Sequence, residues 1–158
     1  MEKADIANEV TEREEERKQL EDIEACLSTL QRLQSLFLAR PHNGNFLKAE
    51  ELEQAKGRKC ILGISGLKYL KYEKFFEVTP IGVNIVEPYA DFNTYIAAPV
   101  DSVLRVLQGV LNGDTSAFTA EWARGKTRIV GARHLHDGYV FGEVFRRLAE
   151  LIKRYRTS

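Results

Sequence analysis

The chain has 158 residues, of which 44% are hydrophobic and 29% are charged, so it is long enough to bury a core as one globular domain. Its 23 Lys and Arg residues balance its 23 Asp and Glu residues, which excludes a net charge that would attract nucleic acid or an anionic membrane. Two distant cysteines, Cys26 and Cys60, make no disulfide framework, and no apolar run approaches the ~20 residues that span a bilayer. The acidic first residues also lack the apolar stretch of a signal peptide. We therefore expect a cytoplasmic protein without stable membrane insertion.

Charge is distributed unevenly along the chain. Glu and Asp predominate in residues 9–24, whereas basic residues gather in the last turns, at Arg146, Arg147, Lys153, Arg154 and Arg156. Because these basic residues share a predicted helix with a complete apolar stripe, the asymmetry favours end-to-end or subunit contacts over a site for a polyanion.

The spacing of apolar residues predicts one long helix over residues 5–39. Its second half carries an apolar seam, interrupted at Gln34, that consists of Leu20, Ile23, Leu27, Leu30 and Phe37. Leaving these five side chains in water would cost on the order of 10 kcal/mol, so the seam must be covered. The cover is either the chain's own domain or another chain, and the acidic first half of the helix favours a second copy. We therefore predict that the seam is the interface of a homo-oligomer or of a contact with another protein.

A proline and an Asn-Gly pair in residues 40–44 end this helix. A short helix is predicted over residues 46–56, with Gly57 at its end. We accordingly divide the chain into an N-terminal helix with its turn, residues 1–45, and an α+β domain, residues 46–158.

Segments rich in β-branched and aromatic residues follow Gly57, with turn signals at Gly66 and at residues 80–82. They indicate strands over residues 59–65, 67–72, 74–79, 83–87 and 91–97. The aromatic residues in these segments have no basic surround, which favours packing in a sheet over stacking on nucleic-acid bases.

Two further helices are predicted after the strands. Residues 101–111 place valines and leucines on one face of a helix. Asp114 is a suitable N-cap for the next helix, which carries Phe118 and Trp122 on one side.

A strand over residues 126–130 precedes a final helix that begins near Asp137 and carries an unbroken apolar stripe. Strands followed by segregated helices predict an α+β fold. We expect a mostly antiparallel five-stranded sheet that helices cover on one face, preceded by the long N-terminal helix.

Two patterns suggest chemistry that their surroundings do not support. Residues 120–127 loosely match a phosphate-binding loop, but that loop needs a strand before it and a helix after it, and the predicted order is the reverse. His134 and His136 could converge on one metal ion, but His42 lies in a distant loop and further ligands are missing. No nucleophile and no pair of carboxylates has a catalytic setting. We expect no cofactor, no metal, no nucleic-acid partner and no enzyme activity.

A series of short motifs occupies residues 99–131. They are Leu104-x-x-Leu107-x-Gly109, Asn112-Gly113-Asp114, Ala117-Phe118 and Gly125-Lys126-x-x-Ile129-x-Gly131. In this order and spacing they resemble the core of the sterol-carrier-protein (sterol-transfer) family, and the resemblance covers residues 46–152. The helix before residue 40 has no counterpart in the plain carrier domain.

The resemblance implies a sheet covered by helices around an apolar tunnel for sterols, acyl chains or similar molecules, and it carries no catalytic position. We therefore predict non-enzymatic binding of an apolar, lipid-like ligand between the sheet and the helices. Six side chains are expected to line that space, namely Leu104, Leu107, Phe118, Trp122, Phe141 and Phe145. Each of them could equally belong to a filled core. The alternative is then an assembly protein of this fold with an oligomerising N-terminal helix.

Overall fold

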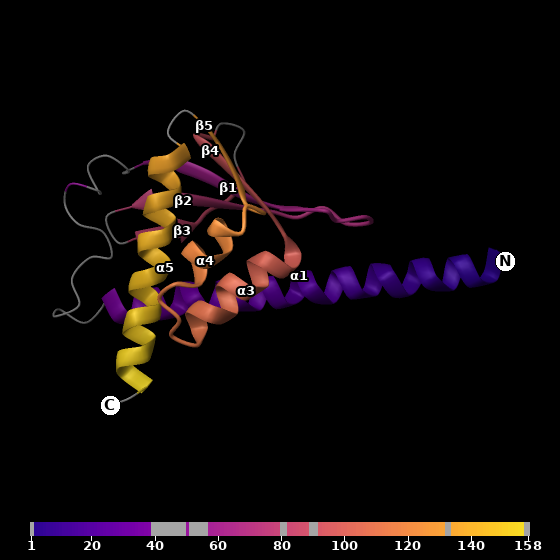
Figure 1. The fold of residues 1–158 in the computed structure, drawn as a ribbon, viewed down its shortest axis with the longest axis horizontal. Coiled ribbons are helices and arrows are strands. Elements are labelled where there is room, and N and C mark those ends of the chain that lie inside the picture. Colours follow the sequence, from indigo (N-terminus) through magenta and orange to yellow (C-terminus); the bar gives the residue numbers. More distant parts are fainter. Residues whose placement is uncertain are drawn as a thin grey trace.

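The computed structural model describes residues 2–38, 50, 57–79, 82–88, 92–131 and 134–156 of the chain. A long helix, α1 (Glu2–Leu38), precedes strands β1 (Lys59–Ser65), β2 (Glu73–Thr79), β3 (Gly82–Ile85) and β4 (Thr94–Pro99). Helices α3 (Val100–Leu111) and α4 (Ala117–Ala123), strand β5 (Arg128–Gly131) and helix α5 (His134–Arg156) follow (Figure 1). The predicted turn at residues 40–44 lies outside the described residues, as do the boundary at residue 45 and, except for Glu50, the short helix over residues 46–56.

The described strands form one five-stranded mixed sheet in the order β3-β2-β1-β4-β5. β2 pairs antiparallel with both β1 and β3, and β5 pairs antiparallel with β4. The central pair is parallel, because β1 and β4 run side by side with Cys60 opposite Thr94 and Ile64 opposite Ala98. The predicted α+β fold with a mostly antiparallel five-stranded sheet is confirmed.

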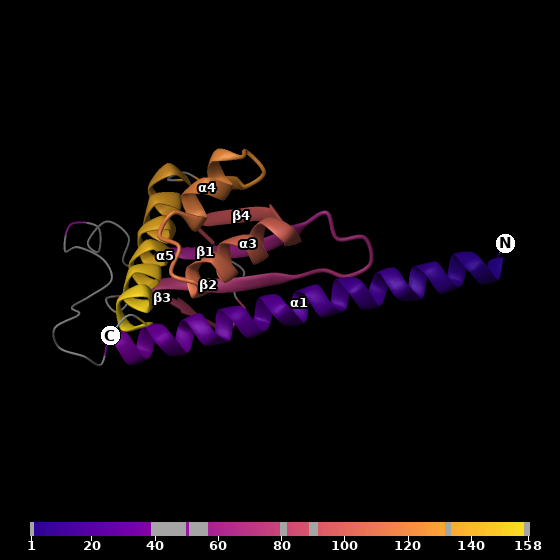
Figure 2. The same ribbon diagram turned by 60° about the horizontal axis from the view of Figure 1, so that its bottom comes forward.

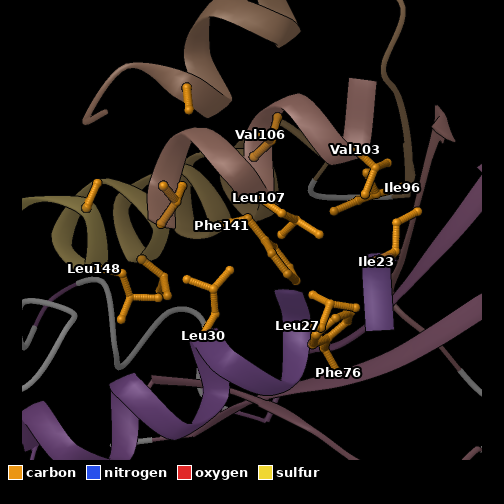
Figure 3. Packing of buried hydrophobic residues seen from close by; sticks show 14 of the residues in the cluster. Ile23, Leu27, Leu30, Phe76, Ile96, Val103, Val106, Leu107, Phe141 and Leu148 are labelled. Atoms are coloured by element: carbon orange, nitrogen blue, oxygen red, sulfur yellow. The ribbon is translucent and has the colours of Figure 1, made fainter. Parts of the chain in front are cut away.

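The helices lie together on one side of this sheet (Figures 1 and 2). Alternation along β4 explains this arrangement, since Thr94, Ile96 and Ala98 are buried while the residues between them are half-buried on the other face. The buried side chains of α1, α3, α5 and the sheet point toward one another in a single apolar core (Figure 3). An amphipathic helix such as α3 requires such a core to bury its apolar face, and Leu107 and Val110 on that face are nearly inaccessible to solvent.

Residues 67–72 are not a strand, although the sequence predicted one. Gly66, with a φ of +77°, turns the chain out of β1, and residues 67–72 form the connection to β2. The backbone N–H of Ile64 donates a hydrogen bond to the Tyr72 carbonyl at 3.1 Å and closes this connection. The aromatic residues that suggested a strand serve instead as contacts for α1.

Glu16 on α1 holds this connection in place. Its carboxylate accepts hydrogen bonds from the backbone N–H groups of Lys68 at 2.9 Å and of Tyr69 and Leu70 at 3.1 Å each. Burial raises the pKa of the Glu16 carboxyl, but the three N–H groups outweigh burial and hold the pKa below its ordinary value. A charged side chain of α1 therefore decides the path of the chain between two strands.

The start of the last helix and the N-cap of α4 differ from the prediction. Helix α5 begins at His134, so Asp137 lies within the helix instead of in front of it. Asp114 precedes α4, but the position before the helix is Ser116, whose backbone N–H donates to Asp114 Oδ1 at 2.9 Å. Asp114 thus stabilises the turn between α3 and α4, where aspartate commonly accepts the N–H two residues on.

The apolar seam of α1 packs against the chain's own domain. All five predicted seam residues are buried, from Leu20 at 9% exposed to Ile23 at 0%. At the end of the helix, the Phe37 ring stacks on the Tyr155 ring of α5 with centroids 5.3 Å apart. Gln34, the polar interruption of the seam, is 2% exposed and donates from Nε2 to Asn84 Oδ1 at 3.2 Å.

This placement corrects the assignment of Leu20, Ile23, Leu27, Leu30 and Phe37 to a subunit interface. A side chain that is buried among α1, α3, α5 and the sheet of one copy is not accessible to a second copy. Oligomerisation itself stays a prediction, and it would have to use another surface of α1.

Two leucines of α1 test whether the helix belongs to the core. Leu27 is 5% exposed and Leu36 is 55% exposed. We expect Leu27→Ala to lower the free energy of unfolding by about 2–5 kcal/mol, because it removes buried carbons and leaves a cavity. Leu36→Ala should change it by less than about 0.5 kcal/mol. Urea denaturation of dilute protein measures both, and equal effects of the two substitutions would contradict the packing of α1.

Candidate functional site

A row of aromatic rings crosses the interior from the sheet to α4. The Phe76 ring of β2 meets the Phe141 ring of α5 edge-on, with centroids 5.8 Å apart. Phe145, one turn further along α5, stacks on Phe118 of α4 at 5.7 Å. Trp122 then meets Phe118 edge-on at 5.7 Å. Such contacts add about 0.5–1.5 kcal/mol each beyond the burial of the rings.

Two small apolar pockets flank Phe145, which lines both of them. The first has a volume of about 40 Å³ and lies between α1, α5 and the strands β2 and β3; its walls are Leu27, Leu30, Gln31, Gln34, Phe76, Ile85, Phe141, Val144, Phe145 and Leu148. The second has a volume of about 50 Å³ and lies between α3, α4, α5 and the strands β1 and β4; its walls are Leu62, Ile96, Ala98, Ser102, Val103, Val106, Leu107, Phe118, Thr127 and Phe145.

The six predicted lining residues divide between the pockets and the surrounding core. Leu107 and Phe118 line the second pocket, Phe141 lines the first, and Phe145 lines both. Leu104 and Trp122 line neither pocket: Leu104 is half-buried against the core, and Trp122 meets the Phe118 ring edge-on.

The sequence did not identify most of the other residues that line the two pockets. Ala98, Ser102 and Thr127 are small side chains that carry no helical apolar pattern. For Ile96 and Ala98 the alternation along β4 was available as a signal, since every second residue of that strand is buried toward the helices. Leu27 and Leu30 of the α1 seam were assigned to another role.

The two pockets differ in the polar groups at their walls. In the first, Gln31 and Gln34 of α1 both donate from Nε2 to Asn84 Oδ1, at 3.3 and 3.2 Å. Gln31 Oε1 also accepts a hydrogen bond from the backbone N–H of Ile85 at 2.8 Å, so these amides tie α1 to the edge strand β3. In the second, Ser102 and Thr127 are the wall residues with a polar side chain.

A charged network lies behind Ser102. Glu121 of α4, which is 4% exposed, accepts a hydrogen bond from Arg105 Nε at 2.8 Å and lies 3.2 Å from Arg124 Nε. Arg105 Nη2 also donates to Ser102 Oγ at 3.4 Å. Burial raises the pKa of the Glu121 carboxyl, but Arg105 and then Arg124 outweigh burial, so the pKa lies below its ordinary value. The network attaches α4 to α3 beside the second pocket.

A glycine allows this attachment. A Cβ atom on Gly109 of α3 would lie 2.8 Å from the Cβ atom of Ala117 at the start of α4. Any larger residue would therefore push the two helices apart. This contact gives a physical reason for the Gly109 and Ala117 positions of the motifs between residues 99 and 131.

Neither of the two chemical patterns in the sequence becomes a site among the described residues. Gly125, with a φ of +75°, ends α4, and β5 follows, so residues 120–127 run from helix to strand. The described part of the chain holds no group of three His, Cys, Asp or Glu side chains that could bind a metal ion, and the side chains of His134 and His136 lie outside it. Among the described helices, none has the length and apolar character needed to cross a membrane.

No protein-family model matches the sequence, and no curated protein does either. Solved structures similar to this chain include sterol carrier proteins and a related protein. One is a UbiJ-SCP2 ubiquinone synthesis protein, 13% identical, with 81% of this chain and 95% of that chain covered and a TM-score of 0.48. Sterol carrier protein 2 like 2 from Aedes aegypti is 16% identical, with 75% and 97% covered and a TM-score of 0.42. Sterol carrier protein 2 from Yarrowia lipolytica, in its apo form, is 12% identical, with 75% and 88% covered and a TM-score of 0.42.

With TM-scores of 0.42–0.48, these structures do not assign the chain to a family. At 12–16% identity they assign no ligand to the chain.

The charges of the Glu121 network should make the free energy of unfolding depend on pH. Because the folded-state pKa of Glu121 is lowered, its stabilising effect is present above the ordinary carboxyl pKa of 4.5 and is lost as pH falls through the lowered value. We expect Glu121→Gln to cost about 2 kcal/mol of unfolding free energy at pH 7 and much less at pH 3. Glu14→Gln, which breaks an exposed pair with Arg17, is the control and should have little effect at either pH. Urea denaturation at both pH values measures this, and a deficit of Glu121→Gln that persists at pH 3 would contradict the charge argument.

Proposed function

We propose that this chain binds one elongated apolar molecule in the space between its sheet and its helices. The observation that carries the proposal is the pair of apolar pockets on either side of Phe145. A rotation of that ring would join the two pockets into one space that runs from α1 to α4. An extended acyl or isoprenoid chain has the shape that such a space would accept.

The size of the pockets sets the condition for binding. Sites for small molecules usually have volumes of about 300–1,000 Å³, whereas the two pockets have about 40 and 50 Å³. Binding therefore requires Phe145 to move, and α4 with it, because Phe118 stacks on Phe145. α4 is short and is followed by Gly125, which has no side chain and can therefore absorb a change in backbone angles.

The proposed role is binding without catalysis. The second pocket has Ser102 in its wall, and the nearest carboxylate of the network is Glu121. A carboxylate whose pKa is held low by two guanidinium groups is a weak base at neutral pH and does not activate a hydroxyl. Hydroxyl and amide groups at the walls would instead orient the polar end of a ligand.

A second candidate function follows from the same volumes. If Phe145 keeps its position, the interior is a filled core and the domain is an assembly protein. The two functions differ in one measurable property, which is whether an added apolar chain enters the interior.

Two neighbouring alanines of β4 provide a matched test. Ala98 lines the second pocket, whereas Ala97 lies on the other face of the strand, opposite Gly63. We expect Ala98→Ile to fill the pocket and to weaken binding of palmitate, farnesol or cholesterol at least about tenfold, and Ala97→Ile to leave it unchanged. Titration monitored by the fluorescence of Trp122, the single tryptophan, measures the affinity.

Organic extraction of freshly purified protein, followed by mass spectrometry, provides an independent readout. A stoichiometric acyl, isoprenoid or sterol-like species supports the proposal. A clean extract together with no fluorescence response to any of the three probes would contradict it and would favour the assembly protein.

A further inference from the structure

The first turns of α1 extend beyond the edge of the domain (Figure 2). Ile6 lies two heptads before Leu20 on the helix, so it continues the stripe that the core buries further along. In these first turns the stripe is not covered, since Ile6 is 61% exposed and Val10 is 57% exposed. We call the surface formed by residues 5–12 of α1 the tip.

The tip belongs to a strongly acidic part of the chain. Between residues 5 and 16 the sequence has one basic residue, Arg13, and six acidic ones: Asp5, Glu9, Glu12, Glu14, Glu15 and Glu16. Arg13 pairs with Glu9 at 3.4 Å and Lys68 pairs with Glu12 at 3.3 Å, and an excess of negative charge remains after these two pairs. Two tips placed side by side would therefore repel each other. A partner for this apolar and acidic surface has to be basic.

The opposite end of the molecule combines an exposed apolar residue with basic residues. Leu36, near the end of α1, is 55% exposed. The stack of Phe37 on Tyr155 brings this end of α1 beside the last turn of α5. The last turn of α5 carries Lys153, Arg154 and Arg156, of which Arg154 pairs with Glu150 at 3.3 Å. Arg32 of α1 lies one turn from Leu36. We call the surface formed by Arg32, Leu36 and the last turn of α5 the base.

We propose that copies of this chain associate head to tail, with the tip of one copy on the base of the next. The charges of the two surfaces are complementary, and each surface carries an exposed apolar side chain that the contact would cover. Because the two surfaces are different, the contact is heterologous, and each copy keeps one free tip and one free base unless a ring closes. The proposal is independent of ligand binding.

Sedimentation velocity of the full chain over a range of concentrations tests this contact. We expect oligomers that grow with concentration and that weaken at least about tenfold in affinity between 0.05 and 0.5 M NaCl, because salt screens exposed charges. The tip variant is Ile6→Ser with Val10→Ser, and the base variant is Arg32→Glu with Leu36→Ser. Val130→Ser, at an exposed valine of β5, is the matched control and should associate as the unsubstituted chain does.

Mixing the two variants distinguishes a head-to-tail contact from a symmetric one. Each variant alone should be monomeric. An equimolar mixture should form a dimer that does not grow further, because only the intact base of the tip variant can meet the intact tip of the base variant. A monomeric unsubstituted chain at every concentration would overturn the proposal, and so would oligomers that the base variant retains.

Discussion

The burial of one apolar stripe of α1 is the interaction on which the rest of the structure depends. Ile23 is fully buried, and Leu27 and Leu30 lie between α5 and the sheet while they also line the first pocket. Without this helix the helix-facing side of β2 and β3 would be in water, and Phe141 and Leu148 of α5 would lose the α1 side chains that share the first pocket with them (Figure 3). α1 is therefore a wall of the interior and not an appendage to a separate domain.

Polar groups fix how this wall is attached. The Gln31 and Gln34 amides bind the edge strand β3, and the Glu16 carboxylate binds the connection between β1 and β2. Glu24, between them, forms an ion pair with Lys74 at 3.0 Å. Burying a polar group without a partner is costly, so these contacts define one position of α1 along the sheet, which apolar packing alone would not do. At α4 the buried carboxylate of Glu121 is likewise paired, with Arg105 and Arg124.

Much of the fold could be predicted from the sequence because its periodic segments are long. The seam of α1, the amphipathic face of α3 and the stripe of α5 each repeat over several turns, which makes the helix type unambiguous. The surface that covers the seam could not be predicted. The periodicity of apolar residues shows which face of a helix is buried, but it does not show which element that face packs against. The strand predicted over residues 67–72 was wrong because these residues contact Glu16, more than fifty positions away in the sequence. That contact overrides their local β propensity.

The candidate site was predictable only in its large side chains. Phe118, Phe141 and Phe145 stand out at helical spacing, but the same spacing placed Leu104 and Trp122 in the site, where the structure does not. A pocket is formed where side chains are small, as at Ala98 and Ser102, and such residues do not stand out by the helical spacing of large apolar side chains.

Methyl-resolved NMR during titration with farnesol tests the central claim, that an apolar chain enters the interior by displacing Phe145. Leu30 reports on the first pocket, Leu107 on the second, and Val130 on the exposed outer face of β5. We expect the methyl signals of Leu30 and Leu107 to shift together and to saturate at one farnesol per chain, while those of Val130 stay in place. Shifts at Val130 alone, or no shift at Leu30 and Leu107, would contradict it.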